Sequence, residues 1–438
     1  MSRLTIDRHR LMQDIHHTAQ WGEGERWGQN PTEVGMARLA LSDADKLVRD
    51  WFIETTEALG CRVHFDAMGN IFAIRPGKRE GPPTAMGSHL DTQPAGGRYD
   101  GILGVLAGVA VLRAVHEAGL ETEYPLCVVD WTNEEGARFP QCMMASAVWA
   151  GVTSIDTAHA VASVDDGEVT VGSELARIGY RGDTAAHHTA TPLAAHFELH
   201  IEQGPILEAA GQRIGAVQGV QAMRWFTITV TGRDSHTGAT NFENRADAML
   251  AAAKMIVRSH QVATQFQGLA STGLLTVHPG STNTVPGVVT FSLDLRADAD
   301  PKMDAMEAAL RADFAAIAAG TETFTDSCTC GRGCAVSWQT TARAPVARFD
   351  DDCLRCIEEG AEDLFGAAQA AALTRRMYSG AGHDSVHTST RVPTAMIFVP
   401  CRDGVTHNPT EYTAPEDCGN GAQVLLNAVL RFDAARKA

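Results

Sequence analysis

The feature of this sequence that most restricts its fold is the alternation of short apolar runs, typical of buried strands, with longer helical runs. Strands are predicted over 61–74 (a pair joined by a Met-Gly-Asn turn), 84–90, 125–132, 194–204 and 393–399. Helices are predicted over 101–119, 351–365 and 415–434. Strands that alternate with helices predict an α/β fold with a largely parallel central sheet.

The pattern changes between residues 213 and 330. The order of predicted elements there is strand, helix, two strands, helix and strand, over 224–232, 244–261, 272–280, 287–297, 301–320 and 321–330. This β-α-β-β-α-β order is typical of a ferredoxin-like domain. We therefore expect one catalytic α/β domain, formed by 1–212 and 331–438, that is interrupted by an inserted domain at 213–330.

Charge and composition exclude several classes of function. With 36 basic and 53 acidic residues the net charge is −17, which disfavours binding to nucleic acid or to an anionic membrane surface. No apolar run approaches the roughly 20 residues needed to span a bilayer, and the first residues do not read as a signal peptide. We therefore expect a cytoplasmic protein whose 10 cysteines are free thiols.

Histidines and carboxylates stand where the predicted strands end. They are His89 and Asp91, Asp100 at the start of the next helix, Glu134 and Glu135, His200, and His407. Ligand sites in open α/β sheets gather at the carboxyl ends of the strands. Mixed histidine and carboxylate ligands suit zinc, and also manganese, cobalt or nickel. The set is too large for one tetrahedral ion and predicts two divalent ions that share a carboxylate.

Less specific interpretations exist for each of these features. An isolated His-x-Asp is usually a capped turn, and adjacent glutamates usually lie on a solvated surface. The position of each feature at a strand end beside glycine favours the metal site. A second zinc site is conceivable at the cysteines, but they lack paired CxxC spacing and we expect free thiols: Cys328, Cys330, Cys334, Cys353 and Cys356.

Five motifs carry these residues: GSHLDTQPAGGRYDGILGVLAG, WTNEEGARFP, HIEQGPILE, SGAGHDS and THNPTEYTAPED. With them, the chain resembles the hydantoinase/carbamoylase-type amidase branch of the dinuclear metal aminoacylase and carboxypeptidase superfamily. The resemblance extends from about residue 20 to the last predicted helix. The HIEQG motif is specific to this branch, because other members of the superfamily have a carboxylate where His200 stands.

The resemblance implies a role for each residue of the site. Asp100 would bridge two metal ions, of which one is bound by His89 and His200 and the other by Glu135 and His407. Asp91 would orient His89. Glu134 would be the general base and later the proton donor.

The resemblance also implies a substrate-binding set and an assembly. The inserted domain would be a lid and dimerisation domain, and His236 would reach the active site of the partner in a homodimer. The substrate carboxylate would be held by Arg296 with Gln203, Asn283, Gly380 and Gly382. The chain departs from the family pattern at Asn241 and Phe242, after the lid histidine.

The expected activity is cleavage of an N-carbamoyl-L-amino acid to the free amino acid, ammonia and carbon dioxide. Three alternatives within the same chemistry remain: β-ureidopropionase, allantoate amidohydrolase, and a broader N-acyl-amino acid or dipeptide hydrolase. An alternative of a different class is a catalytically silent binding protein on the same fold, which would not need an unligated Glu134.

Overall fold

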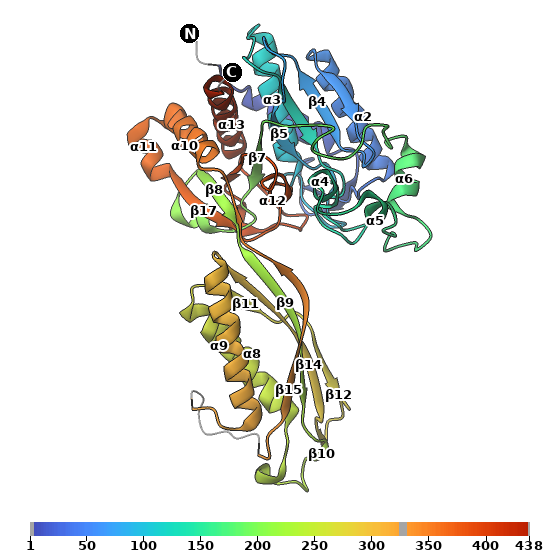
Figure 1. The fold of residues 1–438 in the computed structure, drawn as a ribbon, viewed down its shortest axis with the longest axis vertical. Coiled ribbons are helices and arrows are strands. Elements are labelled where there is room, and N and C mark those ends of the chain that lie inside the picture. The colour runs from blue at the N-terminus through green and yellow to red at the C-terminus, as the bar shows by residue number, and fades with distance from the viewer. Residues whose placement is uncertain (1–3, 324–330, 437–438) are drawn as a thin grey trace. The chain divides into compact units, whose positions relative to one another are not determined.

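The computed structural model describes residues 4–323 and 331–436, which form two compact units. The larger unit comprises Met1–Gly219 and Arg348–Ala438, and the smaller comprises Val220–Ala347. Figure 1 shows the larger unit as a sheet between helices, and the smaller as a sheet with two long helices on one face.

The larger unit is built on a nine-stranded sheet. Its strands are β3 (Arg62–Phe65), β4 (Ile71–Arg75), β5 (Thr84–Ser88), β6 (Leu126–Asp130), β7 (Ala195–Ile201), β8 (Ile214–Val220), β16 (Ala347–Arg348), β17 (Thr374–Ser379) and β18 (Thr394–Val399). The order is β16-β8-β18-β7-β5-β6-β4-β3, and β17 also pairs with β8. The central strands β18, β7, β5 and β6 are parallel, whereas β8, β4 and β3 pair antiparallel to their neighbours. The predicted α/β class with a largely parallel central sheet is confirmed.

Helices cover both faces of this sheet. The α3 helix (Ile102–Glu117) and α13 (Pro415–Ala435) pack on each other on one side, and Trp149 of α4 packs with Phe72, Ala85 and Val129 on the other. The α2 helix (Asp43–Ala58) contacts β3 and β4. Nearly all of α3 is buried, since it also contacts β5, β6, β7 and α1, and this explains its continuous apolar sequence. The other helices of this unit are α1 (Arg8–Thr18), α4 (Met144–Trp149), α5 (Ile155–His159), α6 (Val171–Ile178), α7 (Ile206–Ala210), α10 (Asp351–Phe365), α11 (Ala367–Leu373), α12 (Ser385–Thr388) and the 3-10 turn η2 (Arg402–Gly404). A small separate ribbon joins β1 (Glu23–Arg26) to β2 (Val34–Met36).

The smaller unit is an antiparallel sheet with two helices. Its elements are β9 (Ala222–Thr231), α8 (Ala248–Gln265), β11 (Leu269–Ser271), β12 (Leu275–His278), β14 (Val288–Ala297), α9 (Asp300–Ala319) and β15 (Ala335–Ala344), with a short ribbon of β10 (Ser235–His236) and β13 (Thr284–Val285) and the turn η1 (Phe242–Asn244). The order is β11-β14-β9-β15, and β12 also pairs with β14. Its own core contains Phe226, Phe291, Leu295 and Phe314.

Two positions differ from the sequence prediction. The strand predicted over 321–330 falls largely outside the described residues, as do Cys328 and Cys330, and β15 at 335–344 is the strand that pairs with β9. The units also change at 219/220 and 347/348, not at 212/213 and 330/331. The reason is that β8 and β9 follow one another almost without a loop but belong to different sheets, so residues 214–231 read as one continuous strand-like run.

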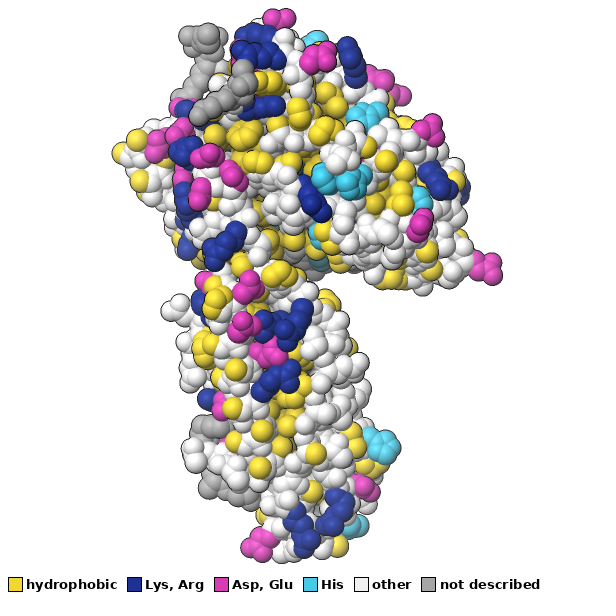
Figure 2. Space-filling view, viewed as in Figure 1, with side chains coloured by type: hydrophobic (Ala, Val, Ile, Leu, Met, Phe, Trp, Pro, Cys, Tyr) yellow, Lys and Arg dark blue, Asp and Glu magenta, His cyan; other side chains and the backbone are white. Residues whose placement is uncertain are grey.

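The surface is mixed in character. Figure 2 shows acidic and basic side chains interspersed with apolar ones over the visible face. Throughout 4–323 and 331–436, no helix is both long enough and apolar enough to cross a membrane. Cys353 and Cys356 are buried free thiols on α10.

Candidate metal centre

The predicted ligands lie at or after the carboxyl ends of four parallel strands, at one edge of the large sheet. His89 follows β5, Glu134 and Glu135 follow β6, His200 is near the end of β7, and His407 lies in the loop after β18. The strand order reverses at β5, which has β6 on one side and β7 on the other. Ligand sites form at such reversals, because the loops leave adjacent strands in opposite directions.

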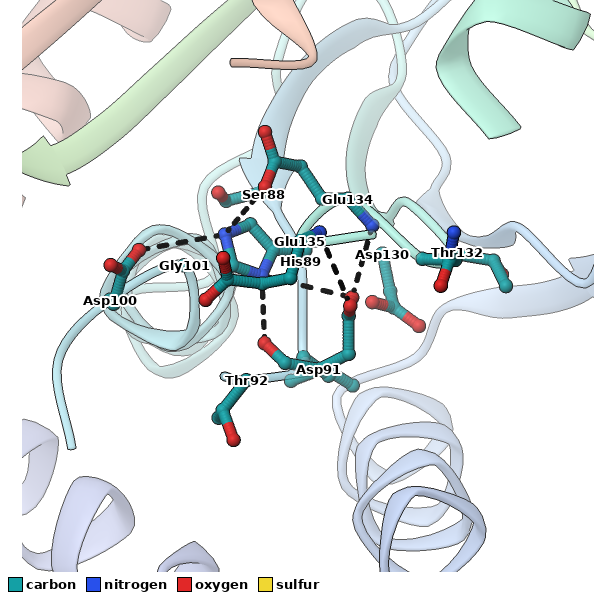
Figure 3. A network of polar contacts seen from close by, with 12 residues as sticks. Ser88, His89, Asp91, Thr92, Asp100, Gly101, Asp130, Thr132, Glu134 and Glu135 are labelled. Carbon is teal, nitrogen blue, oxygen red and sulfur yellow. Dashed lines mark hydrogen bonds and ion pairs between the residues drawn. The ribbon is translucent and has the colours of Figure 1, made fainter. Parts of the chain in front are cut away.

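One group of ligand atoms consists of His89, Asp100 and His200, all buried. Oδ1 of Asp100 lies 3.0 Å from Nε2 of His200 and 3.7 Å from Nε2 of His89. Figure 3 shows the ring of His89 between Asp100 and Asp91.

A second group consists of Asp100, Glu135 and His407. Nε2 of His407 lies 3.5 Å from Oδ2 of Asp100 and 3.4 Å from Oε2 of Glu135. Asp100 therefore offers one oxygen to each group. The structure brings together all five residues that the sequence suggested as ligands, in the two pairs around Asp100 that the resemblance implied.

The two buried histidines are held in one tautomer by main-chain carbonyls. Nδ1 of His89 donates to the carbonyl oxygen of Asp91 at 2.9 Å, and Nδ1 of His200 donates to that of Ile201 at 2.8 Å. In the neutral form of each ring, Nε2 is then unprotonated and points into the site, as a metal ligand requires. The orientation of His89 comes from the backbone of Asp91, whose carboxylate Oδ1 is 3.8 Å from Nδ1.

The carboxylate of Asp91 instead anchors the glutamate loop. It accepts the main-chain N–H groups of Glu134 and Glu135 at 3.2 and 3.3 Å (Figure 3). Asn133, just before them, has a left-handed φ of 56°, which re-aims the chain after β6. Asp91 thus positions both glutamates through their backbone.

Glycine is required at the start of α3. Gly101 has a φ of +67°, and a Cβ at this position would lie 2.2 Å from Cε1 of the His89 ring. Only a residue without a side chain lets Asp100 and His89 approach one another closely.

Glu134 lies beside the ligand groups without belonging to either. Its Oε2 is 3.6 Å from Nε2 of His89, and the residue is 8% exposed. Burial raises its pKa well above the ordinary value, and Asp384 and Glu135 add to this effect against the opposing influence of His89. A buried carboxylate of this kind has the properties of a general base or acid.

The charges of the site fit divalent cations. Burial and the nearby Asp100 raise the pKa of Glu135 to about 8. Burial opposes the charge on His200, but Asp100 outweighs it and raises the pKa of the ring. Clustered carboxylates therefore hold protons that a divalent cation would replace, and the donor set of imidazole nitrogens and carboxylate oxygens suits such an ion.

Several hydrogen-bond partners of the metal-site carboxylates were not predicted from the sequence. Thr406 donates to Oδ2 of Asp100 at 2.9 Å and to Glu411, which also accepts the main-chain N–H of Asp100 at 3.0 Å. Gln203, expected to contact substrate, donates to Oδ2 of Asp100 at 2.8 Å. Gln93 similarly donates to Glu135 at 2.7 Å. Thr406 and Glu411 stand in the THNPTEYTAPED motif, which was the available signal.

A further group of possible ligand atoms joins Glu198 and His383 to His200. Glu198 accepts hydrogen bonds from the hydroxyls of Ser88 and Ser385, both at 2.7 Å, so its oxygens are engaged. Burial lowers the pKa of His383 to about 3, and its ring packs edge-on against His200. The alternation along β7 places Glu198 on the same face as His200, and this could have been read from the sequence.

The SGAG loop follows β17 and leads to His383. A Cβ on Gly382 would lie 2.9 Å from Cε of Met143, which follows the glutamate loop. Gly382 therefore lies beside the segment that follows the glutamate loop, whereas a Cβ on Gly380 would meet nothing within 4 Å.

The other expected substrate residues lie in the smaller unit. Nδ1 of His236 accepts the main-chain N–H groups of Gly238 and Ala239 at 3.1 and 3.2 Å. His236 pairs with Thr284, which places it beside Asn283. Arg296 is near the other end of β14, roughly 26 Å along the strand from Val288, and binds Asp294 through Nε and Nη2 at 2.8 and 2.9 Å.

Comparison with known proteins agrees with this geometry. Residues 85–431 match the model of peptidase family M20/M25/M40. The chain is 37% identical over 428 residues to an N-carbamoyl-L-amino-acid amidohydrolase of Rhizobium meliloti, covering 97% of this chain and 96% of that protein. It is 30% identical over 407 residues to a ureidoglycolate hydrolase of Oryza sativa, covering 91% and 80%. A solved amidase of the hydantoinase/carbamoylase family from Burkholderia multivorans superposes with a TM-score of 0.89 at 39% identity, covering 99% of this chain and 100% of that one.

Proposed function

Because the chain belongs to peptidase family M20/M25/M40, which is metal-dependent, we propose that it cleaves the carbamoyl C–N bond of an N-carbamoyl-L-amino acid. The chain is a hydrolase of amide bonds, as its amidohydrolase relatives are. The products are the free amino acid, ammonia and carbon dioxide. The observation that carries the proposal is the buried, unligated Glu134 beside two ligand groups that share Asp100.

The reaction uses the chain's residues as follows. His89, His200, Asp100, Glu135 and His407 hold two divalent ions, zinc by preference and manganese, cobalt or nickel as substitutes. The bound ions supply Lewis acidity toward water and the substrate carbonyl. Glu134 accepts a proton from the attacking water at Oε2 and returns it to the amino nitrogen that leaves.

The substrate carboxylate is held by Arg296, with Gln203, Gly380 and Gly382 near the metal centre and Asn283 on the smaller unit. The planar guanidinium fits a carboxylate with two parallel hydrogen bonds, as its present pairing with Asp294 illustrates. On substrate binding, the guanidinium of Arg296 forms hydrogen bonds with the substrate carboxylate, either in place of those with Asp294 or in addition to them.

His236 acts on the substrate carbonyl of a partner subunit in a homodimer. Because its Nδ1 accepts two main-chain N–H groups, a neutral His236 carries its proton on Nε2 and can donate it to an oxyanion. His236 pairs with Thr284, just before β14 begins, whereas Arg296 is near the far end of β14, and this supports the use of the two residues at different active sites. The edge of the small sheet exposes Leu269, Leu274 and Leu275, which supports an isologous contact there.

A complementation experiment tests the shared site. His236→Ala and Glu134→Gln are each expected to be inactive, and mixing them gives heterodimers in which one site has both residues. Recovery of activity on mixing supports the shared site. Absence of recovery, when subunit exchange is demonstrated independently, rules it out.

Hydrolysis of ureidoglycolate is the second candidate, because of the similarity to the Oryza sativa enzyme. Release of ammonia is measured with N-carbamoyl-α-amino acids, N-carbamoyl-β-alanine, allantoate and ureidoglycolate, and release of the free amino acid is measured with N-acetyl amino acids. Glu134→Gln is the matched control. The highest kcat/KM is expected for an N-carbamoyl-L-α-amino acid. A metal-loaded chain that hydrolyses none of these substrates would support the silent binding protein.

A further inference from the structure

The larger unit contains a pocket outside the set of metal ligands and their substrate partners. Its volume is about 350 Å³, within the range of small-molecule sites. The N-terminal segment contributes Trp27 and Val34, the turn before α3 contributes Arg98, and the loop after β18 contributes Arg402, Glu411 and Tyr412. The pocket thus lies next to Tyr99 and Asp100 without including a metal ligand.

Arg98 brings a buried positive charge to this pocket. The residue is 6% exposed, and its Nε donates to the carbonyl of Val34 at 2.8 Å. In the parts of the chain that the structure describes, it forms no ion pair with a carboxylate. Buried charges are normally paired, and an unpaired guanidinium that lines a pocket points to an anionic ligand.

Arg402 brings a second guanidinium. It lies over the rings of Tyr412, at 4.6 Å, and Trp27, at 5.7 Å, and its Nη2 donates to the carbonyl of Thr410 at 3.1 Å. Among the described residues it too lacks an ion pair. The aromatic rings hold the guanidinium in a fixed plane while its remaining N–H groups stay available.

Among the described residues, the acidic side chains of the pocket form no ion pair with these arginines. Glu33 accepts hydrogen bonds from the main chain and side chain of Asn30 at 2.9 and 2.8 Å, and these bonds lower its pKa more than the charge of Arg402 does. Glu411 accepts the main-chain N–H groups of Tyr99 and Asp100, both at 3.0 Å, and the hydroxyl of Thr406. Two arginines without an ion pair at one pocket are notable in a chain of net charge −17, in which many other arginines are ion-paired.

We infer that this pocket binds a small organic carboxylate at a site separate from the metal centre. The carboxylate lies between the guanidiniums of Arg98 and Arg402, and the organic part packs against Trp27 and the apolar side chain of Val34. The site does not depend on the reaction at the metal centre, so its test does not depend on the proposed activity.

Calorimetric titration of the metal-loaded protein with succinate and with benzoate tests the inference. Succinamide and benzamide serve as neutral counterparts of the same shape. At least one carboxylate is expected to bind, and Arg402→Gln and Arg98→Gln are each expected to weaken it by about 10-fold or more, the usual effect of losing a hydrogen bond to a charged group. Arg355→Gln, which removes an exposed arginine paired with Asp352 on α10, is the matched control and keeps the wild-type affinity.

Arg402→Gln decides the outcome if Arg98→Gln fails to fold, because Arg402 is exposed and makes one hydrogen bond to the part of the chain that the structure describes. Binding that is unchanged in Arg402→Gln would place the carboxylate elsewhere, for example at the metal ions, and overturn the inference. Absence of binding by both carboxylates, or equal binding of the neutral amides, would overturn it as well.

Discussion

Replacement of Gly101 by alanine should damage the metal centre although glycine has no side chain that could bind a metal ion. Gly101 stands between Asp100 and α3 with a φ of +67°, and the added Cβ would lie 2.2 and 2.3 Å from Cε1 and Nε2 of His89. Ordinary carbon contacts are about 3.5 Å or longer, so the ring or the helix start must move by roughly 1 Å. His89 or Asp100 would then leave its position in the ligand group.

Two costs combine in this variant. The positive φ of this turn costs a residue with a side chain at least about 1 kcal/mol, and overpacking of a buried site costs about 1–3 kcal/mol more. We expect the free energy of unfolding of the metal-stripped protein to fall by about 2–4 kcal/mol. We expect metal affinity to fall by at least about 10-fold, because displaced supporting groups alone have effects of this size.

Gly119→Ala is the matched control. Gly119 follows α3 with a φ of +60°, but a Cβ there meets nothing within 4 Å. This variant should lose only about 1 kcal/mol and keep both metal content and activity. Urea unfolding of the stripped proteins and metal content after dialysis against a competing chelator separate the two effects. If Gly101→Ala behaves like Gly119→Ala in both measurements, the argument from close approach to His89 is wrong.

Four further expectations concern the metal centre and the residues proposed to bind substrate. Glu134→Gln should fold and keep its metals but lose at least ~10²-fold in kcat, and near-normal turnover would remove Glu134 from the mechanism. Binding of Zn²⁺ to the metal-stripped chain at pH 6.5 should release protons into a weakly buffered solution, because the pKa of Glu135 is about 8 before metal binds. The Glu135→Gln variant should release fewer protons and bind less metal. The stripped chain should also lose stability, measured as Tm, as pH rises from about 4.5 to 8, because the protonated Glu135 carboxyl is favoured only in the folded state. Arg296→Lys should weaken use of carboxylate-bearing substrates and leave carboxylate-free amides nearly unaffected, whereas equal losses would make Arg296 structural.

The convergence of these histidines and carboxylates could be anticipated from the sequence because parallel strands end at a common edge. An apolar strand followed by His89, or by Glu134 and Glu135, specifies both the position of the side chain in the fold and its neighbours. The order of the strands was not needed for this, since any parallel arrangement brings their carboxyl ends to the same side.

Other parts could not be anticipated, for identifiable reasons. The change from β8 to β9 has no turn signal, because the chain leaves one sheet and enters the next in a nearly continuous extended run. The support of Asp100 by Glu411 joins residues 311 positions apart, and no local pattern predicts such a contact. The pairing of His89 with the carbonyl of Asp91 depends on the turn of the loop and not on the identity of the side chain.

The same carbonyl contacts determine which changes this site can tolerate over evolutionary time. A carboxylate that fixes a histidine ring can be lost in a single point mutation, whereas the carbonyls of Asp91 and Ile201 are present whatever residues stand there. Amino-acid substitutions at positions 91 and 201 therefore leave the tautomer of His89 and His200 unchanged. Insertions and deletions would change it, because they would move the carbonyl away from the ring. Variation in loop length near positions 90 and 201 should be far rarer among functional descendants of this chain than variation in side chains there.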